Sequence, residues 1–166
     1  MPTIHEFLEE LDREAPPTRR SLEQVREDKL DWKPHEKSQT LGQLAYHVAN
    51  IPKALGELSL LTEFDVSFVV PRPSVANRAE LLKVHDESVA RAREVLSGMD
   101  DAALGLPWRM MLGKQEIGAM PRGVFIRSVL FNHWYHHRGQ LTVYLRETGS
   151  MVPAIYGASA DETPGG

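Results

Sequence analysis

Apolar residues in this chain recur at alternating steps of three and four, the spacing of one face of an α-helix. The longest such run consists of Leu41, Leu44, Val48, Ile51, Leu55 and Leu58. An apolar stripe of this length has to pack against other helices. Apolar residues with similar spacing occur in the segments that begin at Ile4, Leu81 and Arg122. The pattern therefore predicts an all-α fold, a bundle of helices.

Capping residues indicate where these helices begin and end. Thr40 and Asn77 precede two of the apolar runs and are candidate N-caps, since their side chains can accept hydrogen bonds from free backbone N–H groups. Gly98 and Gly149 follow the third and fourth runs and are candidate ends. We expect helices over 4–29, 41–62, between Asn77 and Gly98, and over 122–147.

Prolines and the connections between helices make parts of this prediction less regular. Pro16 and Pro17 are expected to kink or split the first helix, and Pro52 to bend the second, because proline removes a backbone donor and clashes with the preceding turn. Residues 64–73 are expected to form a connection. The connection over 99–121, between helices three and four, is long and predicts either a small hairpin or a plain loop.

Length, charge and cysteine content exclude several classes of protein. With 166 residues the chain suits a single domain over 1–166, and the net charge of −4 offers no broad basic surface for nucleic acid or acidic membranes. The absence of cysteine excludes disulfides, thiolate ligands and a cysteine nucleophile. No secretory signal or membrane-spanning apolar run is evident. We therefore expect a cytoplasmic protein without a nucleic-acid or membrane partner.

Two histidines four residues apart lie in the last predicted helix. His133 and His137 share a face of that helix, and the face continues the apolar positions. Buried imidazoles need partners for their nitrogens, and a divalent metal ion provides one. Trp134 stands where a zinc protease of the His-Glu-x-x-His type has its glutamate, so that class is not expected. The alternative is that both histidines are hydrogen-bonded core or surface residues. His136 lies off their face and is expected either in solvent or in contact with the ligands without binding the metal itself.

His47 is the best candidate for a third ligand. It lies three residues after Leu44 and four before Ile51, beside the apolar seam of the second helix. Three neutral imidazoles with open positions are the arrangement of a catalytic zinc site rather than a structural one. The alternative is a single core histidine satisfied by Tyr46 or by a backbone carbonyl.

The remaining histidines and the acidic residues give weaker signals. His5, His35 and His85 are expected to be solvated imidazoles. Acidic residues such as Asp28 and Asp86 are candidates for a fourth ligand or a base, and nothing in their spacing selects among them.

Several motifs resemble those of the DinB family, also called DinB/YfiT-like. They are LGQLAYHVAN at 41–50 with Trp32-Lys33-Pro34 before it, Met120-Pro121-Arg122, NHWYHHRGQL at 132–141 and VPAIYG at 152–157. The His-x-x-x-His-Arg-Gly-Gln motif, joined with the histidine of the second helix, is fairly specific to this family.

The resemblance implies a four-helix bundle, often dimeric, with a three-histidine metal site that opens on a cleft. Carried over by position, the ligands are His47, His133 and His137, and the metal is zinc first and nickel next. Known relatives transfer or isomerise small molecules with low-molecular-weight thiols: one branch isomerises maleylpyruvate with mycothiol, and another attaches bacillithiol. Near this site Arg138 could reach an anionic group or be a surface charge, and Tyr156 could close over the metal or be a packing anchor.

Three hypotheses follow. The first is a metal-dependent enzyme of the thiol-dependent transferase or isomerase type, or a hydrolase, that acts on a small-molecule substrate as a homodimer. The second is a non-catalytic metal-binding or stress-response protein with the same dimeric bundle. The third is a dimeric scaffold without metal.

Overall fold

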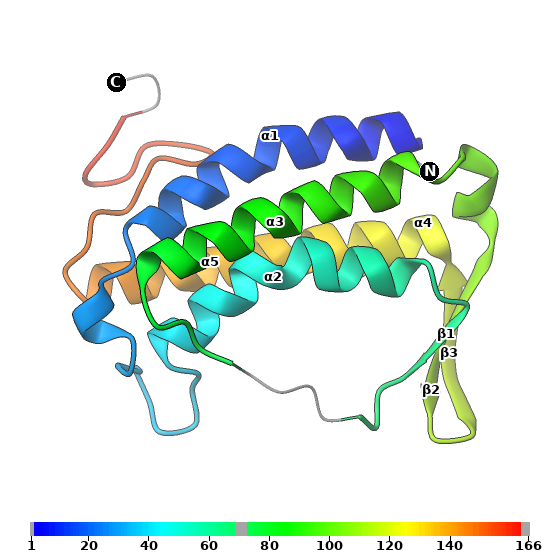
Figure 1. The fold of residues 1–166 in the computed structure, drawn as a ribbon, viewed down its shortest axis with the longest axis horizontal. Helices are drawn as coiled ribbons and strands as arrows, with labels where there is room; N and C mark the ends of the chain where they lie inside the picture. Colours follow the sequence, from blue (N-terminus) through cyan, green and yellow to red (C-terminus); the bar gives the residue numbers. More distant parts are fainter. Residues whose placement is uncertain (1, 69–72, 164–166) are drawn as a thin grey trace.

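A computed structural model describes residues 2–68 and 73–163, and in these residues four long helical segments run alongside one another (Figure 1). They are α1 (Ile4–Glu23), α2 (Leu41–Ser59), α3 (Arg78–Ser97) and a continuous run of α4 (Arg122–Phe125), η3 (Ile126–Phe131) and α5 (Asn132–Glu147). Short 3₁₀ turns occupy Glu27–Lys29 (η1) and Asp101–Gly105 (η2). The last helical run covers the predicted range of 122–147, and its middle part, η3, is a π-helix.

The capping residues predicted for the second and third helices and the glycine ends of the third and fourth are confirmed, whereas α2 ends at Ser59, short of the expected residue 62. The Thr40 side chain accepts from the backbone N–H of Gln43, whose own side chain accepts from the Thr40 N–H, so the two form a capping box. The Asn77 side chain accepts from the backbone N–H of Glu80 and so caps α3, and Gly98 ends that helix. Gly149 has φ +77°, the left-handed conformation in which glycine ends a helix without strain.

Of the two outcomes expected for the first helix, the split is wrong, because α1 continues through Pro16 and Pro17. These prolines remove the N–H partners of the Asp12 and Arg13 carbonyls. Asp12 and Arg13 both lie on the exposed face of α1, where water can replace the lost hydrogen bonds. The helix ends at Glu23 rather than reaching residue 29.

The all-α expectation is wrong for the connections, which carry a small three-stranded sheet. Strands β2 (Pro107–Leu112) and β3 (Gln115–Pro121) pair antiparallel, so the hairpin alternative for 99–121 is confirmed. Its two-residue turn begins at Gly113, with φ +61°. Strand β1 (Glu63–Asp65) pairs parallel to β2 and was expected to be part of a plain connection, of which residues 69–72 lie outside the described part.

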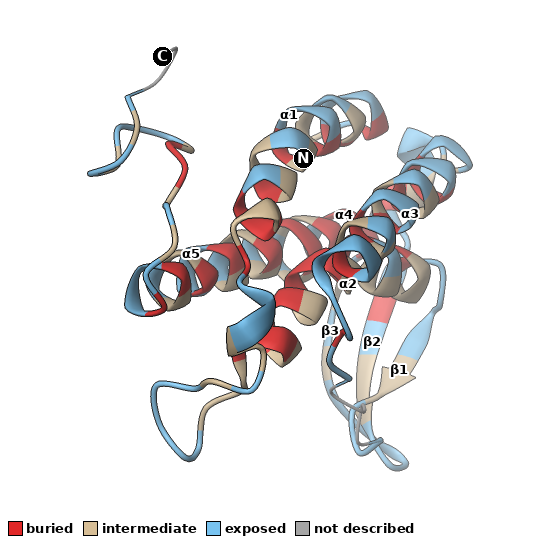
Figure 2. Ribbon diagram, turned by 60° about the vertical axis from the view of Figure 1, so that its left-hand side comes forward, coloured by how far each residue is buried: buried red, intermediate tan, exposed pale blue. Residues whose placement is uncertain are grey.

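The core lies between the inward faces of the helices, coloured red in Figure 2. Leu41, Leu44, Val48 and Ile51 of the predicted α2 seam are at most 2% exposed. Helix α2 packs on α3 and on α5, and α1 packs on α3. This arrangement brings the middle of α2 next to the first turns of α5. In the part of the chain that is described, no helix is long and apolar enough to cross a bilayer.

Candidate metal site

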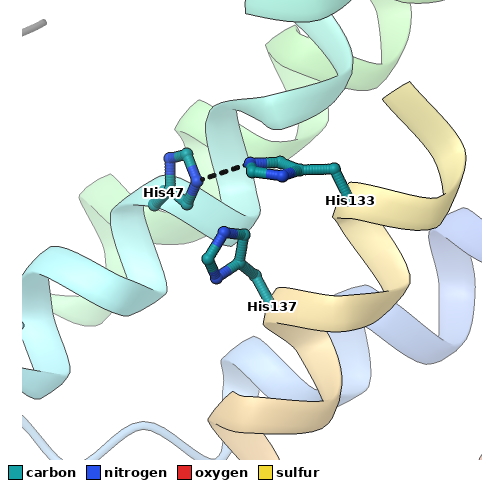
Figure 3. A group of neighbouring side chains, drawn as sticks. All are labelled: His47, His133 and His137. Atoms are coloured by element: carbon teal, nitrogen blue, oxygen red, sulfur yellow. Dashed lines mark hydrogen bonds between the residues drawn. The ribbon is translucent and has the colours of Figure 1, made fainter. Parts of the chain in front are cut away.

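The three predicted histidines meet between α2 and α5 (Figure 3). His47 comes from α2, and His133 and His137 come from successive turns of α5. One ring nitrogen of each lies within 4.8 Å of those of the other two. The Nε2 atoms of His47 and His133 are 3.1 Å apart. All three side chains are half-buried, so the group lies at the edge of the core rather than inside it.

The local sequence explains how two helices supply this group. On α5 the four-residue spacing of His133 and His137 brings their rings together edge to face, with centroids 4.4 Å apart. The π-helical segment η3 ends at Phe131, and α5 begins at the next residue. A π-helical turn holds more residues than an α-helical one and shifts the faces of everything after it, and such turns recur near functional sites. The ring of His47 is also 4.4 Å from that of His137.

The protonation of these rings suits a cation rather than an anion. Burial, together with the neighbouring His137 and His136, lowers the pKa of His133 to about 4. At neutral pH this imidazole is therefore uncharged. The Nδ1 atom of His137 lies 2.7 Å from the amide oxygen Oε1 of Gln140. Because an amide oxygen only accepts, Nδ1 donates to it, and in the neutral form of this ring Nε2 keeps its lone pair.

The geometry fits a small divalent cation. Zinc bonds imidazole nitrogen at about 2.0–2.1 Å, so two nitrogens on one tetrahedral zinc are separated by roughly 3.3 Å. The 3.1 Å between the Nε2 atoms of His47 and His133 is close to that separation. Among residues 2–68 and 73–163 no fourth histidine, aspartate or glutamate joins the group. The donor set is thus three imidazole nitrogens, a type of ligand that zinc and nickel both accept.

The structure places the other histidines apart from this group, and one of them was predicted wrongly. His5, His35 and His136 are exposed as expected, although the His136 ring stays 4.9 Å from that of His137. His85 was expected in solvent but is only 2% exposed. Burial lowers its pKa, and this effect is partly opposed by Asp86, whose carboxylate lies 3.2 Å from Nδ1.

The acidic candidates for a fourth ligand pair with arginines instead. Asp28 accepts hydrogen bonds from Arg26, and Asp86 accepts from Arg19. Neither carboxylate belongs to the three-histidine group.

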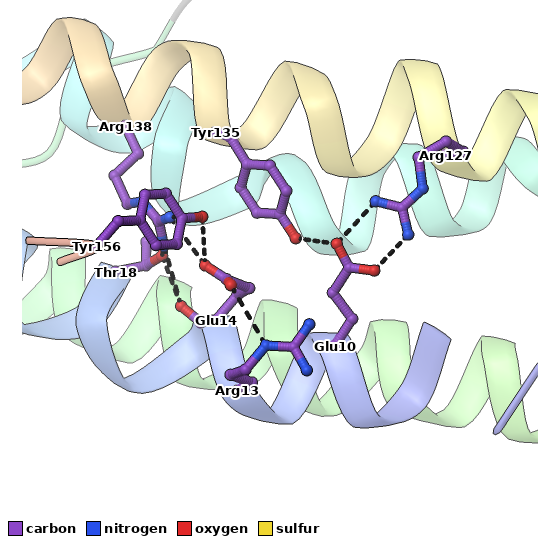
Figure 4. Close-up of polar contacts among 8 residues, drawn as sticks. All are labelled: Glu10, Arg13, Glu14, Thr18, Arg127, Tyr135, Arg138 and Tyr156. Atoms are coloured by element: carbon purple, nitrogen blue, oxygen red, sulfur yellow. Dashed lines mark hydrogen bonds and ion pairs between the residues drawn. The ribbon is translucent and has the colours of Figure 1, made fainter. Parts of the chain in front are cut away.

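Arg138, which is buried, and Tyr156, which is 73% exposed, belong to one polar network between α1 and α5 (Figure 4). The Arg138 side chain is 2% exposed, so it is not a surface charge. Its guanidinium donates to a carboxylate oxygen of Glu14 at 2.8 Å and to the hydroxyl of Thr18 at 2.8 Å. The Tyr156 hydroxyl donates to the same carboxylate at 2.8 Å, which ties the C-terminal segment to α1. Arg138 and Tyr156 also bond to each other, and their other partners, Glu14 and Thr18, are on α1, whereas His133 and His137 meet His47 of α2.

A second carboxylate of α1 continues this network. Glu10 accepts from the guanidinium of Arg127 and from the hydroxyl of Tyr135, the latter at 2.5 Å. Burial alone would raise the pKa of Glu10, but these hydrogen bonds outweigh burial and lower it. Two ion pairs therefore fix α1 to the helical run that carries the histidines.

Gln140 is a contact of the candidate ligands to which the sequence argument assigned no role. It lies within the recognised motif, three residues after His137, a spacing that places two side chains on the same helix face. That spacing, combined with the need of a ligand imidazole for an acceptor on its second nitrogen, was the available signal.

Sequence comparison gives one family and one curated relative. The DinB family profile matches residues 1–164. The uncharacterized protein YrdA of Bacillus subtilis (strain 168) is 29% identical over 164 residues, which is 96% of this chain and 92% of that protein.

Comparison with solved structures also finds a protein described as DinB-like. A DinB-like protein from Bacillus cereus ATCC 10987 superposes with a TM-score of 0.72 at 26% identity, covering 93% of this chain and 98% of its own. The mycothiol-dependent maleylpyruvate isomerase superposes with a TM-score of 0.54 at 16% identity, covering 92% of this chain and 65% of its own, so this likeness concerns the fold. Because the family profile spans nearly the whole sequence, the chain belongs to the DinB family.

Proposed function

We propose that this protein is a metal-dependent enzyme in which His47, His133 and His137 hold one divalent cation, zinc first and nickel next. The reaction is of the thiol-dependent transferase or isomerase type on a small molecule. The convergence of three ring nitrogens within 4.8 Å of one another, from two helices, carries this proposal.

The protein's own groups suit that role. A bound cation would act as a Lewis acid and lower the pKa of a thiol or water that it contacts. The low pKa of His133 keeps that ring neutral, and Gln140 holds the His137 ring with its Nε2 lone pair available. The buried ion pair of Glu14 and Arg138 joins α5 to α1.

The donor count favours catalysis over a purely structural metal. Structural zinc sites are closed by four protein ligands, whereas catalytic sites have three and an open position. Within the described residues, the group has three histidines and no carboxylate. The fold likeness to a mycothiol-dependent isomerase supports the choice of a thiol cosubstrate, although it concerns the fold and not the site.

Metal content is the first test. We would load wild-type protein and the His133→Ala and His136→Ala variants with Zn²⁺, dialyse them, and measure bound metal by elemental analysis. One ion per chain is expected for wild type and for His136→Ala, whose ring is exposed, and almost none for His133→Ala. Negligible metal in the wild type after exposure to both Zn²⁺ and Ni²⁺ would refute the proposal.

Activity is the second test. The loaded protein would be offered mycothiol, bacillithiol or glutathione with a panel of small electrophiles that includes maleylpyruvate, and thiol consumption or isomer formation would be followed. Turnover that needs both metal and thiol is expected. A protein that binds metal but shows no turnover with any pair supports instead the metal-binding or stress-response alternative.

The proposed assembly is a homodimer, as the family resemblance implies. Light scattering coupled to gel filtration would give twice the 18.7 kDa chain mass. A mass of one chain across the micromolar range would contradict it.

A further inference from the structure

Helix α2 contains a backbone carbonyl that has lost its partner within the helix. Pro52 lies inside α2 and has no N–H to offer to the carbonyl four residues before it, that of Val48. Val48 is fully buried, so the carbonyl needs another donor. The indole Nε1–H of Trp134 provides it at 2.9 Å, from a side chain that is itself 0% exposed.

This hydrogen bond lies beside the candidate metal site. Val48 follows His47 on α2, and Trp134 follows His133 on α5. The bond therefore joins the immediate neighbours of the two rings whose Nε2 atoms are 3.1 Å apart. Successive side chains on a helix point about 100° apart, so the indole enters the core while the imidazole meets its partner at the edge.

We infer that the hydrogen bond from Trp134 to the Val48 carbonyl, created by Pro52, fixes the separation and register of α2 and α5 where His47 and His133 meet, and thereby sets metal affinity. Trp134 is on this view a positioning residue that touches no metal. This role rests on the proposed metal binding.

The chain offers a matched control. Trp108 also donates from its indole Nε1 to a carbonyl of α2, that of Leu58 at 3.0 Å, and is 1% exposed. Leu58 lies ten residues beyond Val48, which is roughly 15 Å along the helix. Trp108→Phe thus removes an indole hydrogen bond to the same helix, α2, and a similar side-chain volume, at a point away from the histidines.

The experiment compares wild type, Trp134→Phe, Trp108→Phe and the double variant Trp134→Phe with Pro52→Ala. Zn²⁺ affinity is measured by competition with a chromophoric chelator, and melting temperature is measured on the metal-free protein. We expect Trp134→Phe to weaken Zn²⁺ binding by about tenfold or more, and Trp108→Phe to change it by less than about twofold while lowering the melting temperature comparably.

The double variant separates positioning from stability. Pro52→Ala gives the Val48 carbonyl a helical N–H partner, so the double variant should regain much of the melting temperature that Trp134→Phe loses. The double variant can also be measured if Trp134→Phe alone does not fold. Zn²⁺ affinity should stay weak, because the bond between helices is still missing. Recovery of affinity together with stability, or equal affinities for the two single tryptophan variants, would overturn the inference. Absence of Zn²⁺ binding by wild type would instead refute the proposed function.

Discussion

The buried ion pair between Glu14 and Arg138 gives the sharpest prediction about stability. The side chains are 6% and 2% exposed, and replacing Glu14 by Gln leaves a guanidinium charge in the core without its counter-ion. Removing one member of such a pair costs about 3–5 kcal/mol. Arg138 keeps its bonds to the Thr18 hydroxyl and the Glu14 carbonyl, so we expect the lower end, about 3 kcal/mol. For a domain of this size that lowers the melting temperature by about 6–12 °C.

The control is an ion pair of the same type on the surface. Glu57 and Arg91 are joined at 2.8 Å between α2 and α3, but their side chains are 41% and 42% exposed. Glu57→Gln should cost less than about 1 kcal/mol. Calorimetry and urea unfolding of both variants measure the difference. The double variant Glu14→Met with Arg138→Met should recover most of the loss, because apolar side chains replace the pair without leaving a charge. Equal costs for Glu14→Gln and Glu57→Gln would refute this reasoning.

Three further predictions concern the site and its support. Gln140→Leu removes the acceptor of the His137 Nδ1–H and should weaken Zn²⁺ binding by about tenfold in a chelator competition; unchanged affinity would remove Gln140 from the site. His137→Ala should abolish Zn²⁺ uptake in elemental analysis while His136→Ala preserves it, and equal losses would show that the helix face is misassigned. The pKa of Glu10 in the folded protein lies below the ordinary glutamate value of 4.5, as in the unfolded chain, so its stabilising contribution is present above that pH and lost as the pH falls through the folded value. The difference in unfolding free energy between wild type and Glu10→Gln should therefore shrink between pH 5 and about pH 2; a constant difference in urea titrations would contradict the assignment.

The helices and the three-histidine group were predictable because their signals are local. Thr40 and Asn77 each cap a helix through a side chain and the next turn, and both are recognisable in the sequence. The pair of His133 and His137 follows from helical spacing alone. His47 needed only its place beside a continuous apolar seam, since the seam must face the other helices.

The parts that could not be predicted depend on partners far away in the sequence. Arg138 was ambiguous because its counter-ion, Glu14, lies 124 positions earlier. His85 sits on a mostly polar helix, yet the packing of α1 and α2 on α3 buries it. Strand β1 has three residues, too few for a periodic pattern, and exists because β2 pairs with it. The role of Pro52 becomes visible only with the indole that bonds to the carbonyl it frees.

The most direct test of the metal site is a crystal structure of Zn²⁺-loaded protein, with anomalous data collected on both sides of the zinc absorption edge. The account predicts one anomalous peak between α2 and α5, about 2.0–2.1 Å from a ring nitrogen of each of His47, His133 and His137. A zinc peak bound elsewhere, or a fully loaded crystal in which any of these three rings turns away from the metal, would contradict it.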